Sequence, residues 1–119
     1  MKIGIVGLGL IGGSLAKALK YNTAHTVLGW NRNQDTLLKA KLLGAVDGEL
    51  TDEEIPQCDM LICALYPKLT VEFVQKYAPV LKKGAIVIDC CGVKRAVCEP
   101  LWEAAAQYGF KSVSYTHLT

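Results

Sequence analysis

A glycine-rich turn near the amino terminus constrains the fold of this chain more than any other feature. Lys2 to Val6 reads as a short apolar strand, and the residues after the turn carry apolar side chains at helical spacing. The turn itself, Gly7-Leu8-Gly9-Leu10-Ile11-Gly12, matches G-x-G-x-x-G at a strand-to-helix junction. There Gly7 permits a sharp turn, Gly9 lets the backbone approach a pyrophosphate, and Gly12 lets the helix pack closely on a sheet. The motif predicts dinucleotide binding at a helix start, and a purely structural glycine turn is the alternative.

Strand-like and helix-like segments alternate along the rest of the chain. Strands are expected at Thr26–Trp30, Met60–Leu65 and Gly84–Asp89, and helices at about 35–44, 70–82 and 93–108. Apolar strands joined by helical crossovers are typical of an α/β fold with a doubly wound parallel sheet and helices on both faces. Asp35 is expected to cap the second helix, and Ala45-Val46 to form a brief extra strand.

The composition excludes several classes of protein. The 119 residues are 51% hydrophobic and carry 13 Lys and Arg against 11 Asp and Glu, with no basic cluster that would indicate nucleic-acid binding. The uncharged stretch from Ile3 to Ala16 is shorter than the roughly 20 residues that span a bilayer. The five cysteines form no Cys-x-x-Cys pair and the two histidines are isolated, so no metal site is expected. Buried, reduced cysteines favour a cytoplasmic protein.

The residues after the second expected strand indicate which dinucleotide the turn accepts. Asn31 stands nineteen residues after Gly12, where an acidic residue would hold the 2′-hydroxyl of NAD and repel the 2′-phosphate of NADP. Asn31 removes that repulsion, and Arg32 offers a planar cation that can pair with the phosphate. The pattern predicts a preference for NADP, with NAD as the alternative. The competing interpretation is that Arg32 is an ordinary solvated loop residue.

Three segments carry a more specific signal than the glycine turn alone. They are Gly7 to Ala16, Ala64-Leu65-Tyr66-Pro67 and Ile88-Asp89-Cys90-Cys91-Gly92-Val93-Lys94. Together they make residues 1 to about 111 similar to prephenate dehydrogenase of tyrosine biosynthesis, an oxidoreductase with a Rossmann domain. Members of that family oxidise and decarboxylate prephenate to 4-hydroxyphenylpyruvate and pass a hydride to NAD or NADP.

The resemblance also assigns roles and partners. It implies that Leu65, Tyr66 and Pro67 border the nicotinamide half of the cofactor and that Lys94 lies near the substrate. It further implies a homodimer made through a helical domain that is missing from this chain. Arogenate dehydrogenase, another Rossmann dehydrogenase or reductase, and a non-catalytic nucleotide-sensing module remain as alternatives.

The chain departs from the family pattern in two places. Gly92 stands where many relatives have a serine that touches the reacting hydroxyl. The family's catalytic histidine, in a His-Pro motif after the sixth strand, has no counterpart, because His25 is expected at the amino end of the sheet and His117 precedes no proline. We therefore expect an incomplete nucleotide-binding domain at 1–111, inactive by itself, and a non-native tail at 112–119 that resembles a translated DNA-library adapter. The alternative is a natural terminus whose Val113 and Tyr115 form an edge strand.

Overall fold

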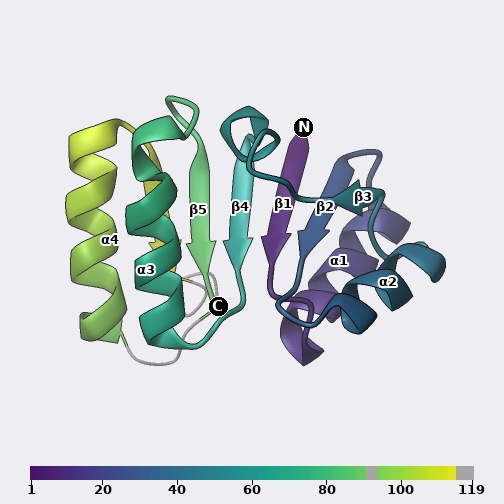
Figure 1. Ribbon diagram of the computed structural model, residues 1–119. Coiled ribbons are helices and arrows are strands. Elements are labelled where there is room, and N and C mark those ends of the chain that lie inside the picture. Colours follow the sequence, from purple (N-terminus) through teal and green to yellow (C-terminus); the bar gives the residue numbers. More distant parts are fainter. Residues whose placement is uncertain (91–93, 115–119) are drawn as a thin grey trace.

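Six parallel strands form a single sheet at the centre of the molecule (Figure 1). The computed structural model describes residues 1–90 and 94–114, and for residues 10, 11, 94–98 and 114 it describes the backbone only. The strand order is β3-β2-β1-β4-β5-β6, with every neighbouring pair parallel. The strands are β1 (Lys2–Val6), β2 (Thr26–Trp30), β3 (Gly48–Glu49), β4 (Met60–Cys63), β5 (Ile86–Asp89) and β6 (Lys111–Ser114).

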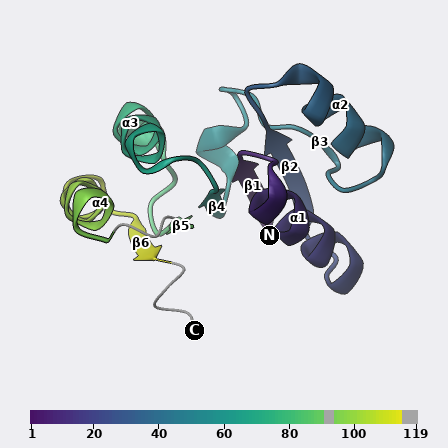
Figure 2. The same cartoon turned by 90° about the horizontal axis from the view of Figure 1, so that it is seen from below.

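Four helices and two short 3-10 turns connect these strands. They are α1 (Leu10–Asn22), α2 (Gln34–Leu42), α3 (Pro67–Tyr77) and α4 (Lys94–Tyr108), with η1 (Ile55–Gln57) and η2 (Ala78–Val80). Figure 2 shows α3 and α4 on one side of the sheet and α1 on the other. The expected doubly wound parallel α/β fold is confirmed.

Each face of the sheet has its own apolar core, because successive strand residues point to opposite faces. Ile3 and Ile5 of β1 pack with Ala16 of α1 and Leu37 of α2. On the other face, the strand residues pack with α3, α4 and the two 3-10 turns. The strand and helix members of that second cluster include Val6, Leu61, Val87, Val74, Leu101 and Ala104. The apolar strands are thus covered on both faces, as their sequences predict.

The second helix begins differently from the sequence prediction. Asn33, and not Asp35, is its N-cap: Asn33 Oδ1 accepts hydrogen bonds from the N–H groups of Asp35 (2.9 Å) and Thr36 (3.3 Å). Asp35 lies inside the first turn, where its charge favours the helix N-terminus. Ala45 and Val46 are buried, but the strand that follows them is β3 at Gly48–Glu49, so the expected boundary was wrong.

Prolines set both ends of the third helix, which begins and ends earlier than expected. Pro67 occupies the first turn of α3, where its fixed φ is favourable and its missing N–H leaves no helical bond unmade. Pro79 lies in η2, after the α-helix has ended at Tyr77. The earlier start places the first turn of α3 directly after β4, at the carboxyl edge of the sheet.

The last described strand is β6, which pairs with β5 so that Val113 lies opposite Ile88. It includes the first residues of the segment predicted as a tail, and residues 115–119 lie outside the described part of the chain. Among the described residues, no helix is long and apolar enough to cross a membrane.

The chain reverses its direction of winding between β1 and β4. From β1 it proceeds outward to β2 and β3, and it then returns to β4 on the other side of β1. Loops leave the carboxyl ends of β1 and β4 toward opposite faces, which opens a crevice in doubly wound sheets. The fold therefore predicts a ligand site at this edge.

Candidate functional site

A cavity of about 1040 Å³ lies at that carboxyl edge. It runs from the end of β2, past the β1–α1 turn, to the ends of β4 and β5. Its lining residues are Gly7, Gly9, Gly12, Trp30, Asn31, Arg32, Ala64, Leu65, Tyr66, Pro67, Leu69, Glu72, Phe73, Lys76 and Cys90. The structure thus brings the glycine turn, the β2–α2 loop and the β4–α3 loop, which the sequence singles out separately, to one cavity.

The three motif glycines meet different surroundings. Gly7 has φ +94°, and a Cβ there would lie 2.5 Å from the carbonyl oxygen of Ala64. A Cβ on Gly12 would lie 1.8 Å from the carbonyl oxygen of Gly7. A Cβ on Gly9 would meet nothing within 4 Å. Packing inside the protein therefore explains Gly7 and Gly12, whereas the space beside Gly9 belongs to the cavity.

Backbone donors at the start of α1 lie beside this space. Gly9 is the N-cap and has no side chain to accept a hydrogen bond, and the first helical hydrogen bond runs from the N–H of Gly13 to the carbonyl oxygen of Gly9 (2.8 Å). The N–H groups of the preceding helical residues have no acceptor within the helix. The first turn of α1 also contains no acidic residue. Such a helix start favours an anionic group.

The apolar residues of the turn have structural surroundings of their own. The side chain of Leu8 is buried in the core between α1 and the sheet, and its N–H donates to Asn31 Oδ1 at 2.8 Å. The side chains of Leu10 and Ile11 lie outside the described part of the chain. Within the described part of this turn, the atoms that can contact a ligand are therefore backbone atoms.

The β2–α2 loop forms one end of the cavity. Asn31 is half-buried; besides accepting from Leu8, it donates from Nδ2 to the carbonyl oxygen of Asn33 at 3.2 Å. Arg32 is exposed and lines the cavity, as does Trp30. A planar cation thus stands at the rim of this end.

The β4–α3 loop forms the opposite end. Tyr66 is 81% exposed and Pro67 begins α3. Thr70 is fully buried beneath this loop, with its N–H donating to the carbonyl oxygen of Tyr66 (2.9 Å) and its Oγ1 donating to that of Leu65 (3.3 Å). The loop is consequently held by the first turn of α3.

One wall of the cavity was missed by the sequence prediction. Leu69, Glu72, Phe73 and Lys76 of α3 all line it. Their spacing of three or four residues puts them on one helix face, away from the buried Val74. The available signal was the apolar pair Leu69 and Phe73, of which Phe73 also packs against the core cluster that contains Val74. Trp30 and Cys90 were also not predicted as lining residues.

A smaller cavity of about 210 Å³ adjoins the main one and shares Trp30, Phe73 and Lys76 with it. On its far side the hydroxyl of Tyr77 donates to Asp52 Oδ1 at 2.6 Å, which joins α3 to the loop before η1. This hydrogen bond to a carboxylate raises the pKa of Tyr77 above its usual range. The α3 wall is therefore tied to the rest of the domain beside the cavity.

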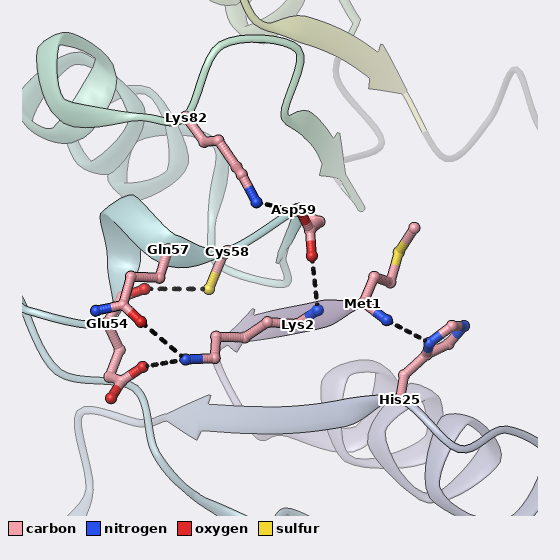
Figure 3. Close-up of polar contacts among 8 residues, drawn as sticks. All are labelled: Met1, Lys2, His25, Glu54, Gln57, Cys58, Asp59 and Lys82. Atoms are coloured by element: carbon pink, nitrogen blue, oxygen red, sulfur yellow. Dashed lines mark hydrogen bonds and ion pairs between the residues drawn. The ribbon is translucent and has the colours of Figure 1, made fainter.

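The remaining predicted residues divide into two groups. Lys94 is the first residue of α4, but its side chain, together with Gly92 and His117, lies outside the described part of the chain. His25 precedes β2 at the amino edge of the sheet, where its Nδ1 lies 2.8 Å from the amino group of Met1 (Figure 3). It is therefore remote from the cavity. Among the described residues, no group of three His, Cys, Asp or Glu side chains could hold a metal ion.

Comparison with known proteins agrees with this geometry. The family described as "Prephenate dehydrogenase, nucleotide-binding domain" matches residues 15–113. A prephenate dehydrogenase of Aquifex aeolicus, solved with hydroxyphenyl propionate and NAD+, is 25% identical, with a TM-score of 0.82 over 94% of this chain and 40% of its own.

Two further solved structures extend the comparison. Synechocystis arogenate dehydrogenase is 36% identical, with a TM-score of 0.80 over 87% of this chain and 37% of its own. Mycobacterium tuberculosis 3-hydroxyisobutyrate dehydrogenase, at 16% identity and a TM-score of 0.82 over 95% of this chain and 39% of its own, shares the fold. The chain spans about 40% of the length of these proteins. The sequence resemblance is confirmed: the chain belongs to the prephenate dehydrogenase family and carries its nucleotide-binding domain.

Proposed function

We propose that the cavity binds a nicotinamide dinucleotide. The observation that carries this proposal is the open space beside Gly9, at a helix start whose N–H groups have no acceptor within the helix. A pyrophosphate can approach the backbone there because glycine has no Cβ, and a Cβ would occupy part of the same space. The cavity extends from this point toward Arg32 on one side and Pro67 on the other, which suits an elongated ligand with two ends. The Aquifex relative was solved with NAD+.

Each part of the ligand has a candidate partner. The N–H groups from Gly9 to Gly12, including those of Leu10 and Ile11, face the pyrophosphate. The adenosine ribose lies toward Asn31 and Arg32. The nicotinamide lies beside the β4–α3 loop, where it would supply the acceptor for the hydride that leaves the substrate. The held loop of Leu65, Tyr66 and Pro67 then orients that ring, and Lys94 stands on the substrate side.

NADP is the proposed cofactor, with NAD as the alternative. The β2–α2 loop presents no carboxylate that would repel a 2′-phosphate, and Arg32 stands exposed at the rim of the cavity. A charge-assisted hydrogen bond of this kind contributes about 1.5–3 kcal/mol, or roughly ten- to a hundredfold in affinity. Arg32→Ala should therefore weaken NADP binding by about that factor and change NAD binding little.

The reaction we propose is the oxidative decarboxylation of prephenate to 4-hydroxyphenylpyruvate, in tyrosine biosynthesis. A hydride leaves the carbon that carries the hydroxyl, the bond to the ring carboxylate breaks to release CO2, and its electrons complete the aromatic ring. This chain supplies the nucleotide-binding part of a cytoplasmic homodimer whose helical domain completes the substrate site. Arogenate oxidation is the second candidate, favoured by the 36% identity to an arogenate dehydrogenase. Assays of the full-length gene product with each substrate separate them by kcat/KM.

Nucleotide binding is tested on the chain itself. Trp30 lines the cavity, whereas Trp102 on α4 is half-exposed and does not, so quenching of tryptophan fluorescence reports ligand binding. We expect saturable quenching by NADP. Gly9→Ala should weaken it at least about tenfold without lowering the melting temperature by more than a few degrees, because its φ of −70° suits alanine. Gly48→Ala in β3 is the matched control, because Gly48 does not line the cavity and its added Cβ would make only an ordinary contact, 3.6 Å from Leu28 Cδ2. Absence of quenching at millimolar NADP and NAD, or undiminished binding by Gly9→Ala, would contradict the proposal.

A further inference from the structure

Asn31 connects the two loops between which an adenosine end would lie. Its Oδ1 accepts the N–H of Leu8 at 2.8 Å, and its Nδ2 donates to the carbonyl oxygen of Asn33 at 3.2 Å. One residue earlier on each strand, the N–H of Gly7 donates to the carbonyl oxygen of Trp30 at 2.7 Å. The glycine turn is therefore joined to the end of β2 at Gly7 and at Leu8, and only the hydrogen bond at Leu8 depends on a side chain.

We propose that Asn31 is a positioning residue: it holds the glycine turn in its binding conformation and leaves contact with the ribose substituent to Arg32. This inference rests on the proposed dinucleotide site. An amide has one oxygen and one NH2 group, and here the oxygen faces an N–H while the NH2 group faces a carbonyl oxygen. Both ends of the side chain are thus engaged within the protein, and the amide orientation follows from its partners.

Packing limits how far the turn can adjust without this contact. The side chain of Leu8 is buried in the core, and a Cβ on Gly29 would lie only 3.0 Å from Leu8 Cδ1. The backbone at Leu8 is consequently held from the core by its side chain and from β2 by Asn31. Because Gly9 follows directly, the position of Leu8 determines where the first N–H groups of α1 are presented.

The same side chain also reaches the second helix. Asn33, whose carbonyl oxygen accepts from Asn31, is the N-cap of α2 through its own Oδ1. Arg32 lies between these two asparagines in the sequence. The contacts of Asn31 therefore hold both sides of the loop that carries Arg32, and they act on a ligand through backbone position.

Two substitutions separate positioning from direct contact. Asn31→Ala removes both hydrogen bonds, whereas Asn31→Asp keeps an acceptor for the N–H of Leu8 and places a negative oxygen against the carbonyl oxygen of Asn33. The probes are ADP, which has a pyrophosphate and a 2′-hydroxyl, and adenosine 2′,5′-bisphosphate, which has a 2′-phosphate. We expect Asn31→Ala to weaken both by about five- to tenfold. Asn31→Asp should bind ADP within about twofold of the wild type and lose at least about tenfold for the 2′-phosphate ligand.

Amide hydrogen exchange at Leu8 gives a readout that ligand contact would not change. In the ligand-free chain, exchange at this N–H should accelerate in Asn31→Ala and stay slow in Asn31→Asp. Asn22→Ala, which removes an asparagine contact to the carbonyl oxygen of Ala18 at the other end of α1, is the matched control and should change neither ADP binding nor the Leu8 amide.

The outcomes separate this inference from the proposed function. Equal loss of ADP binding in Asn31→Ala and Asn31→Asp, or an unchanged Leu8 amide in Asn31→Ala, would overturn the positioning role even if the wild type binds NADP. If the wild type bound no nucleotide, the proposed function would fail, and with it the role in ligand binding. The Leu8 amide would then still decide whether Asn31 holds the turn.

Discussion

The contact between Gly12 and Gly7 allows a stability prediction with a control one residue away. In Gly12→Ala the new Cβ would lie 1.8 Å from the carbonyl oxygen of Gly7 and 3.2 Å from the Cβ of Ala64. Real Cβ atoms keep at least 3.0 Å from such atoms, so helix and turn must separate by more than about 1 Å. The turn resists this movement, since Gly7 has φ +94° and its N–H is bonded to the carbonyl oxygen of Trp30.

The size of the effect follows from two opposing contributions. Alanine is favoured over glycine inside a helix by about 1 kcal/mol. Overpacking costs about 1–3 kcal/mol, and the upper part of that range applies because the obstacle is backbone. The free energy of unfolding should therefore fall by about 2 kcal/mol in Gly12→Ala, which lowers the melting temperature by roughly 8 °C in a domain of this size.

Gly13→Ala isolates the contact, because it makes the same change in the same turn of α1. Its Cβ would meet only the carbonyl oxygen of Leu8, at 3.4 Å, so the variant should be neutral or more stable by up to about 1 kcal/mol. Thermal unfolding followed by circular dichroism at 222 nm, without nucleotide, compares the two. A melting temperature of Gly12→Ala equal to that of Gly13→Ala would refute the argument that the helix approaches the turn too closely for a side chain.

Three further predictions concern parts of the molecule away from the cavity. The Lys82 ammonium, which donates to Asp59 Oδ1 at 2.6 Å, lowers the pKa of that carboxyl. Because the pKa of Asp59 is lower in the folded state, its ionised carboxylate stabilises the protein above about pH 4, and this contribution is lost as the pH falls through the folded-state pKa. Asp59→Asn should therefore flatten the acid side of a plot of unfolding free energy against pH. An unchanged plot would contradict this. Burial raises the pKa of Cys58 to about 11, so about one Cys58 thiol in a thousand is ionised at pH 8. Alkylation of Cys58, followed by mass spectrometry, should therefore be far slower in the folded protein than in the urea-unfolded protein. Equal rates in the two states would contradict this prediction. Leu61→Ala, at a fully buried position, should cost about 3 kcal/mol in urea unfolding, whereas Leu42→Ala, 77% exposed, should stay within about 0.5 kcal/mol, and similar losses in both would contradict the burial argument.

The sheet and the glycine turn were predictable because each has a strong local cause. Strands β1, β2, β4 and β5 are predominantly apolar, and only a few backbone geometries suit G-x-G-x-x-G between a strand and a helix. Details that depend on competition between neighbours were not predictable. Asn33 and Asp35 are both good N-cap residues two positions apart, and the structure decides between them by which oxygen reaches two N–H groups.

The α3 wall of the cavity escaped prediction for a different reason. Val74 and Ala78 are buried in the core and Val71 packs against it, and the apolar side chains of Leu69 and Phe73 do not by themselves indicate a cavity wall. Leu69 and Phe73 line a cavity because β4 and the glycine turn bring the carboxyl edge of the sheet opposite them, while Phe73 also packs against the core. This wall of the cavity depends on the order of the strands in the sheet, which the local sequence of α3 does not contain.

Polar groups at the two edges of the sheet have different partners, so substitutions at one edge should affect stability and substitutions at the other should affect ligand binding. At the amino edge, Lys2 Nζ bonds Glu54 Oε2 at 2.7 Å and Gln57 Oε1 at 3.1 Å, and Asp59 accepts from the N–H of Lys2 and from Lys82 (Figure 3). These charged groups are therefore paired with one another within the protein. At the carboxyl edge, within the part of the chain that the structure describes, Arg32 forms no ion pair and the first N–H groups of α1 have no helical acceptor. Substitutions at the amino edge should therefore change unfolding without changing nucleotide affinity. Removal of the Arg32 charge should do the reverse, because a cation that forms no ion pair with the described residues contributes its interaction energy only when an anion binds.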